Sequence, residues 1–139
     1  MIIRGTTPYH TFVVPLEPQQ IDEVFITYLQ NGEIILDKSS SDVEISEIST
    51  ETENAHMEDY DEIQIEETPI ITSQITVHLT QEDTLKFKFF PAAEKNVAVV
   101  QVRILDTKGE AYASDPIHER IYGVLKDGVI SSNETNSNH

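Results

Sequence analysis

Residues capable of metal binding or acid–base catalysis are present in this sequence, but not at the spacing that either chemistry needs. The five histidines, at positions 10, 56, 78, 118 and 139, are widely separated, and no two have the short spacing typical of a zinc site. Cysteine is absent, which excludes disulfide bonds, thiolate metal sites and a cysteine nucleophile. We therefore predict no catalytic, cofactor-binding or metal-binding residues.

The densest group of carboxylates lies in the segment HMEDYDE, residues 56–62, which contains Glu58, Asp59, Asp61 and Glu62. Carboxylate oxygens are the ligands that calcium prefers, but the segment lacks the turn glycine and the distal glutamate of an EF-hand loop. The sequence also contains no Gly-x-Ser-x-Gly elbow and no glycine-rich phosphate loop. These observations do not predict an enzyme.

The net charge of −16 is unevenly distributed along the chain. Residues 42–67 hold eleven of the 25 acidic residues and no lysine or arginine, so the remainder has a net charge of only −5. This balance argues against direct nucleic-acid binding, because few cations are available to displace counterions from phosphates. We favour interpreting this stretch as a solvated, partly disordered loop insertion, with one or two weak strands expected within it, at 42–46 and 61–67. The alternative is a mimic of DNA phosphates that occupies a basic groove on a partner.

The rest of the chain has the pattern of short strands separated by turns. Asn31-Gly32 between two β-rich runs is typical of a two-residue hairpin turn. Thr80 followed by Asp83 resembles a capping box and predicts a helical turn near 80–87. We expect strands at 9–14, 23–30, 33–38, 73–80 and 96–105, followed by shorter ones after the turn at 106–109. This pattern predicts an all-β, antiparallel sandwich of about seven strands with one short helical turn. We expect a single domain over residues 1–130 with an acidic insertion at about 40–70, followed by a disordered polar tail at 131–139.

Both faces of the predicted hairpin are apolar. A two-residue turn places Leu29 opposite Ile34, Tyr28 opposite Ile35 and Thr27 opposite Leu36. We expect the face with Phe25, Leu29, Ile34 and Leu36 to lie in the core. The face with Ile26, Tyr28 and Ile35 is then a candidate protein-contact surface, unless the N-terminal segment or the acidic segment, for example a strand from residues 60–72, covers it.

The strand alternation also predicts which side chains form the core. The predicted core residues are Phe25, Leu29, Leu36, Ile75, Val77, Leu79, Leu85, Val100, Val102 and Ile104.

Four segments carry a resemblance to a known family: IIRGTTP (2–8), LTQEDTLKF (79–87), ASD (113–115) and LKDGVI (125–130). They resemble small proteins encoded in phage and prophage tail gene clusters of Firmicutes-type gut bacteria. That family is similar to the N-terminal Ig-like domain of siphophage upper baseplate proteins, which attaches receptor-binding parts to the tail. The resemblance covers roughly two-thirds of the chain, and the acidic stretch departs from it by its length.

The resemblance implies an Ig-like sandwich acting as a non-enzymatic structural or adaptor component of a phage tail or baseplate. Its partners would be other tail or baseplate proteins or a second copy of itself. We expect neither membrane insertion nor export, because no run approaches the roughly 18 apolar residues of a membrane span and no signal peptide is recognisable. The expected location is the host cytoplasm during assembly and then the virion tail. The alternative function is an acidic DNA-mimic inhibitor of a nucleic-acid-binding host enzyme.

Overall fold

The structure is a computed structural model that describes residues 1–58 and 62–131, with only the backbone described for 51–58 and 62–68. The described chain is built mainly of strands, together with one short α-helix and three single 3₁₀ turns. The strands are β1 (Ile2–Ile3), β2 (Tyr9–Val14), β3 (Ile21–Gln30), β4 (Glu33–Ser39), β5 (Val43–Glu58), β6 (Glu62–His78), β7 (Val97–Asp106), β8 (Ala111–Ala113) and β9 (Ile117–Tyr122). The helix is α1 (Gln81–Leu85), and the 3₁₀ turns are Pro18–Gln20, Ser40–Asp42 and Ala93–Lys95.

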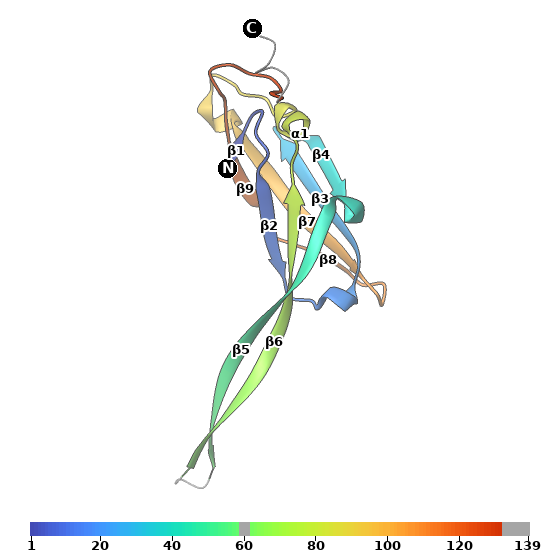
Figure 1. The fold of residues 1–139 in the computed structure, drawn as a ribbon, viewed down its shortest axis with the longest axis vertical. Coiled ribbons are helices and arrows are strands. Elements are labelled where there is room, and N and C mark those ends of the chain that lie inside the picture. Colours follow the sequence, from blue (N-terminus) through green and yellow to red (C-terminus); the bar gives the residue numbers. More distant parts are fainter. Residues whose placement is uncertain (59–61, 132–139) are drawn as a thin grey trace.

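The strands form two sheets that pack as a sandwich (Figure 1). The larger sheet has the order β1-β9-β7-β3-β4, with β8 paired to the far half of β7, and the smaller sheet has the order β2-β6-β5. Immunoglobulin sandwiches place strands B, E and D in one sheet and C, F and G in the other. Here β2, β6 and β5 match the first set, and β3, β7 and β9 match the second. The predicted all-β sandwich is confirmed, with nine strands described and one parallel pair, β1 with β9.

The hairpin turn forms where the sequence predicts it. Asn31 and Gly32 both have positive φ, 52° and 81°, as a type I′ turn requires. Leu29 lies opposite Ile34, as expected, but a β-bulge follows and Tyr28 pairs with Leu36. The expected pairs Tyr28–Ile35 and Thr27–Leu36 are therefore wrong by one residue. Such an extra residue shifts every later side chain of β4 to the other face.

The predicted inward face of the hairpin is also wrong. Ile26 and Tyr28 are fully buried, whereas Phe25 is 39% exposed and Ile34 is 62% exposed. The reason is that β3 is a central strand, and β7 aligns Tyr28 with Val100 and Ile26 with Val102. Side chains of directly opposed residues share a face, so the strong alternation of β7 determines which face of β3 enters the core.

The core otherwise follows the strand alternation. Predicted core residues that are buried are Leu36, Ile75, Val77, Leu79, Val100, Val102 and Ile104. Leu29 and Leu85 are half-buried, and Phe25 lies on the outer surface with the Arg103 guanidinium 5.6 Å from its ring centroid. Further core residues that the alternation did not identify are Ile2, Val14, Val24, Ile26, Tyr28, Phe87 and Ile121.

The predicted helical turn is confirmed, including its capping box. The Asp83 amide donates to Thr80 Oγ1 (3.1 Å), and the Thr80 amide donates to Asp83 Oδ2 (2.9 Å). Lys38 of β4 also reaches this carboxylate, with 2.8 Å between Nζ and Oδ2. Burial raises the pKa of Asp83, but hydrogen bonds from Lys38 and Thr80 outweigh it and leave that pKa below its usual value. The cap therefore joins α1 to β4.

A two-stranded arm extends from one end of the sandwich (Figure 1). β5 and β6 pair continuously from Val43–Val77 to Glu58–Glu62, but β2 accompanies β6 only as far as Ser73. We call residues 49–58 and 62–71 the arm. Most of the acidic stretch lies in paired strands of this arm and its base, so the described backbone holds longer strands than the one or two weak ones expected within the insertion. Part of the candidate calcium cluster, residues 59–61, and the polar tail from 132 lie outside the described residues.

Truncating one of the newly identified core residues tests the corrected face of the hairpin. We expect Ile26→Ala to lower the free energy of unfolding by roughly 2–5 kcal/mol, because it removes a fully buried side chain and leaves a cavity. Ile34→Ala is the matched control on the exposed face, with an expected loss of less than about 0.5 kcal/mol. Urea unfolding followed by circular dichroism measures both, and equal losses would contradict the observed orientation of β3.

Candidate contact surfaces

Two polar side chains inside the sandwich are hydrogen-bonded to each other. Tyr28 of β3 and His10 of β2 share a hydrogen bond of 2.7 Å between the hydroxyl and Nδ1. Burial lowers the pKa of His10 and raises the pKa of Tyr28, so both side chains are neutral near pH 7. Within the described residues there is no group of three metal-ligating side chains. No described helix is long and apolar enough to cross a membrane.

The residues predicted to form a protein contact do not form an exposed surface. Ile26 and Tyr28 are fully buried, and Ile35 is half-buried against the core. Cover comes from Phe87, whose ring meets the Tyr28 ring edge-on at 5.9 Å, and from the second sheet, where His10 of the N-terminal strand β2 is hydrogen-bonded to Tyr28. Part of the segment 60–72 lies outside the described residues. The structure instead presents three other candidate contact surfaces: the arm, a groove and one end of the sandwich.

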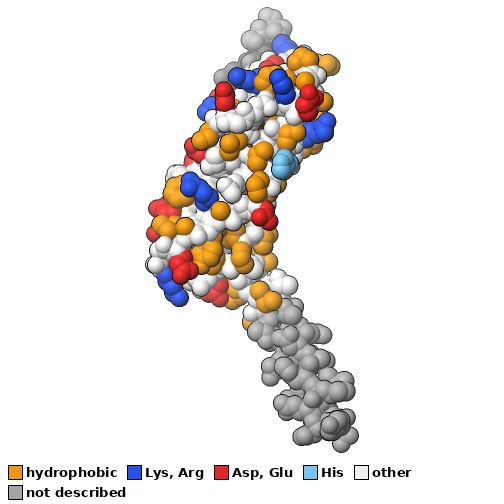
Figure 2. Space-filling model, turned by 180° about the vertical axis from the view of Figure 1, so that it is seen from behind, with side chains coloured by type: hydrophobic (Ala, Val, Ile, Leu, Met, Phe, Trp, Pro, Cys, Tyr) orange, Lys and Arg blue, Asp and Glu red, His pale blue; other side chains and the backbone are white. Residues whose placement is uncertain are grey.

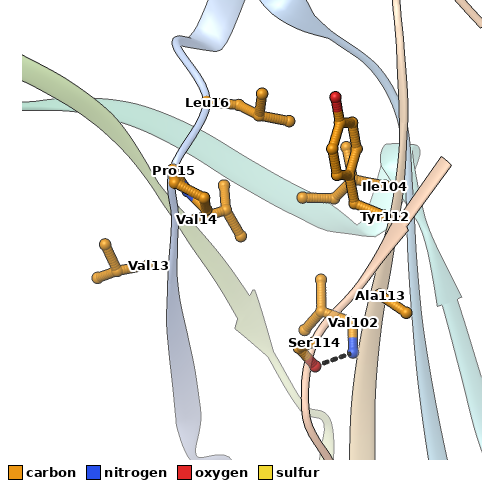
Figure 3. Close-up of a pocket in the computed structure, with 9 residues that line it drawn as sticks. All are labelled: Val13, Val14, Pro15, Leu16, Val102, Ile104, Tyr112, Ala113 and Ser114. Carbon is orange, nitrogen blue, oxygen red and sulfur yellow. Dashed lines mark hydrogen bonds between the residues drawn. The ribbon is translucent and has the colours of Figure 1, made fainter. Parts of the chain in front are cut away.

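The groove lies between the end of β2 and the β7–β8 pair (Figure 3). Val14 and Leu16 line one side and Val102, Ile104 and Tyr112 line the other, around a volume of about 440 Å³. Both β2 and β8 are edge strands, with a partner on one side only. An apolar groove between two unpaired edges has the form of a site for an extended peptide segment.

Carboxylates lie at the tyrosine side of this groove. The Tyr112 hydroxyl lies 3.0 Å from Glu110 Oε2 and 3.3 Å from Asp106 Oδ2. The hydrogen bond to Glu110 is the main reason why the pKa of Tyr112 is raised to about 12. Asp106 also accepts the amides of Lys108 and Glu110, which keep the pKa of its carboxyl below the usual value. This part of the groove favours neutral or cationic occupants.

The third surface is the distal pole, which we define as residues 4–6, 81–96 and 122–131, at the end of the sandwich away from the arm (Figure 1). The buried side-chain amides of Gln30 and Asn96 hold the loop of residues 88–95 in place. Gln30 donates to the carbonyls of Lys88 (2.7 Å) and Lys95 (3.1 Å) and accepts the Lys88 amide (2.8 Å). Asn96 exchanges two hydrogen bonds with the backbone of Phe90, at 2.7 and 2.8 Å.

The remaining segments of the distal pole are tied to α1. The buried Thr84 hydroxyl donates to the Thr6 carbonyl (2.8 Å) and accepts the Gly5 amide (3.0 Å). The Gln81 side chain exchanges two hydrogen bonds with the backbone of Ile130, at 2.8 and 2.7 Å. The Arg4 guanidinium donates a hydrogen bond to the Leu85 carbonyl and forms a salt bridge with Asp127. The distal pole is therefore a fixed surface, although much of it is loop.

The exposed side chains of the distal pole include apolar and cationic groups, together with the carboxylates of Glu82, Glu94 and Asp127. Phe89 is 52% exposed, Ile130 is 70% exposed and Leu125 is fully exposed. The Phe89 ring lies against Gly123, where an added Cβ would come within 3.2 Å of it, so glycine permits this contact. Four exposed lysines belong to the same segments: Lys86, Lys88, Lys95 and Lys126. Figure 2 shows cationic side chains gathered towards this end. A short run, LKFKFF (85–90), was the available sequence signal for this surface.

The buried His10 predicts a specific sensitivity to mild acid. Its pKa is below 6.5 in the folded state, so the unfolded chain binds the proton more tightly. The stabilisation is present above about pH 6.5 and is lost as the pH falls below that value. We expect the free energy of unfolding to decrease more between pH 7 and pH 5 in the parent than in His10→Gln. Parallel slopes in urea unfolding across this range would contradict the assignment.

Comparison with known protein families, with characterised proteins and with solved structures gives no match for this chain. The arm, the groove and the distal pole are the three surfaces of the described residues with the geometry of contact sites.

Proposed function

We propose that this protein is a non-enzymatic structural or adaptor component of a phage tail or baseplate, acting through protein–protein contacts. The observation that supports this most is the arm. Its two strands pair along their length, yet beyond Ser73 no third strand joins them among the described residues. An isolated two-stranded ribbon is at best marginally stable in water, so such an element is best explained by a partner that packs against it.

The remaining features are consistent with the same role. The compact sandwich provides a stable body, while the arm, the groove and the distal pole provide separate places for neighbours. An assembly protein needs several such surfaces, because each subunit contacts more than one other. The resemblance of residues 2–8, 79–87, 113–115 and 125–130 to tail-cluster proteins supports a tail or baseplate as the site of assembly. The protein would then be made in the host cytoplasm and retained in the virion tail.

A second candidate function draws on the charge of the same arm. Residues 42–67 hold eleven acidic residues and no lysine or arginine, and most of these acidic positions lie in paired strands of an extended ribbon. An elongated anionic surface of this kind can occupy a basic nucleic-acid groove, which makes a DNA-mimic inhibitor the alternative. The two functions depend on different properties of the arm. An inhibitor depends mainly on the negative charge of the arm, whereas an adaptor depends on the shape of its two-stranded ribbon.

Mass spectrometry of purified phage particles tests the proposed function. We expect the protein in intact particles at a copy number comparable to that of other tail proteins. A phage whose gene lacks residues 50–70, with Asn-Gly joining Ser49 to Ile71, should yield particles without this protein, because the arm anchors it. The joined residues already face each other in register.

The second candidate predicts the opposite distribution. A protein absent from particles but bound to a nucleic-acid enzyme in the infected cell would overturn the structural role. Changing Glu51, Glu53, Glu66 and Glu67 to glutamine separates the functions further, because the side chains keep their size and lose their charge. Incorporation into particles by this variant favours the adaptor, and its complete loss of enzyme binding favours the inhibitor.

A further inference from the structure

The arm requires a partner, and its composition restricts the surface that can receive it. The arm carries many of the acidic residues of the chain and no lysine or arginine. Two arms laid side by side would bring like charges together, which is destabilising between neighbouring strands. The groove is also unfavourable, because Asp106 and Glu110 lie at its Tyr112 side. A cationic surface with apolar groups is required instead.

The distal pole is the surface of this molecule that meets that requirement. The distal pole carries four lysines and Arg4 against four acidic residues. Asp127 pairs with Arg4 and Asp83 pairs with Lys38 of β4, so the four lysines are set against Glu82 and Glu94. Phe89, Leu125 and Ile130 supply exposed apolar area among these lysines. Clusters of exposed apolar side chains with a charged rim are typical of protein contact sites.

The outer part of the arm matches this combination in sequence and register. The pairing places Ala55 opposite Ile65 and Met57 opposite Ile63, so apolar residues occur at two paired positions near the end of the ribbon. Acidic residues surround these positions along both strands. The arm thus combines apolar and anionic groups where the distal pole combines apolar and cationic groups, and such charge complementarity fixes specificity and orientation.

We propose that the arm of one copy of this protein docks on the distal pole of a second copy. This inference rests on the proposed assembly function and names one of its partners. The arm and the distal pole are at opposite ends of the molecule (Figure 1), so the contact joins two different surfaces. Repeated contacts of this kind link copies in series or close them into a ring or a reciprocal pair.

Two variants, each lacking one half of the contact, provide the test. The arm-less variant replaces residues 50–70 with Asn-Gly and keeps an intact distal pole. The pole variant carries Lys88→Glu, Leu125→Ser and Lys126→Glu, all at exposed positions, and keeps an intact arm. We expect the parent to self-associate in light scattering and each variant alone to be monomeric. Mixing the two variants should restore a one-to-one heterodimer, because each supplies what the other lacks.

Controls separate loss of the contact from loss of the fold. Both variants should unfold cooperatively in urea. Lys108→Glu changes the charge of an exposed lysine near the opposite end of the sandwich and should self-associate like the parent. A parent that is monomeric at high concentration and low salt, variants that still self-associate alone, or a mixture that stays monomeric would each overturn the proposal.

Salt dependence provides an independent measurement. Raising the salt from about 50 mM to about 500 mM shortens the screening length severalfold and should weaken self-association of the parent by roughly tenfold or more. Unchanged association at high salt would mean that charge does not select the distal pole. A monomeric protein that is nevertheless found in particles would refute this inference alone. Absence from particles, together with intact self-association, would refute the proposed tail function instead.

Discussion

The burial of Tyr28 is the constraint on which the rest of the sandwich depends. The Tyr28 side chain has no exposed area. Its hydroxyl is hydrogen-bonded to His10 of the facing sheet, and its ring packs edge-on against the Phe87 ring. Such a large aromatic residue contributes strongly to the core, but only if its polar group finds a partner. His10 of β2 supplies that partner, so Tyr28 of β3 links the two sheets. Through Phe87, Tyr28 also contacts the segment that follows α1.

The bulge in the hairpin is understood from the same constraint. With Tyr28 directed inward, an unbroken register would place Ile35 beside it and direct Leu36 outward. The additional residue in β4 brings Leu36 opposite Tyr28, where it is 5% exposed, while Ile35 remains half-buried at the edge of the core. Bulges bend a strand and increase its twist. The chain thereby places both apolar residues against the core.

The two ends of the molecule are stabilised in different ways, and this difference supports an assembly role. At the distal pole, the buried polar side chains of Gln30, Thr84 and Asn96 replace strand pairing and hold loops in place. At the other end, the arm has backbone pairing but no third strand among the described residues. One end is thus a preformed surface, and the other is a two-stranded ribbon for which we propose a partner. Preformed surfaces bind with a smaller loss of conformational entropy.

Local patterns in the sequence determined the features that depend on a few neighbouring residues. Asn31-Gly32 specifies a turn with two positive φ angles, Thr80 and Asp83 specify the start of α1, and the alternation in β6 and β7 identifies Ile75, Val77, Val100 and Val102 as core. These signals are local because each one involves backbone geometry or strand periodicity within a single segment. The tertiary structure decided the rest. Both faces of β3 are apolar, so its inward face is fixed by the pairing with β7, in which Tyr28 and Ile26 face residues more than seventy positions away in sequence. In the same way, separated segments meet at the distal pole through buried amides and hydroxyls whose partners are backbone groups, which leave no pattern in the sequence.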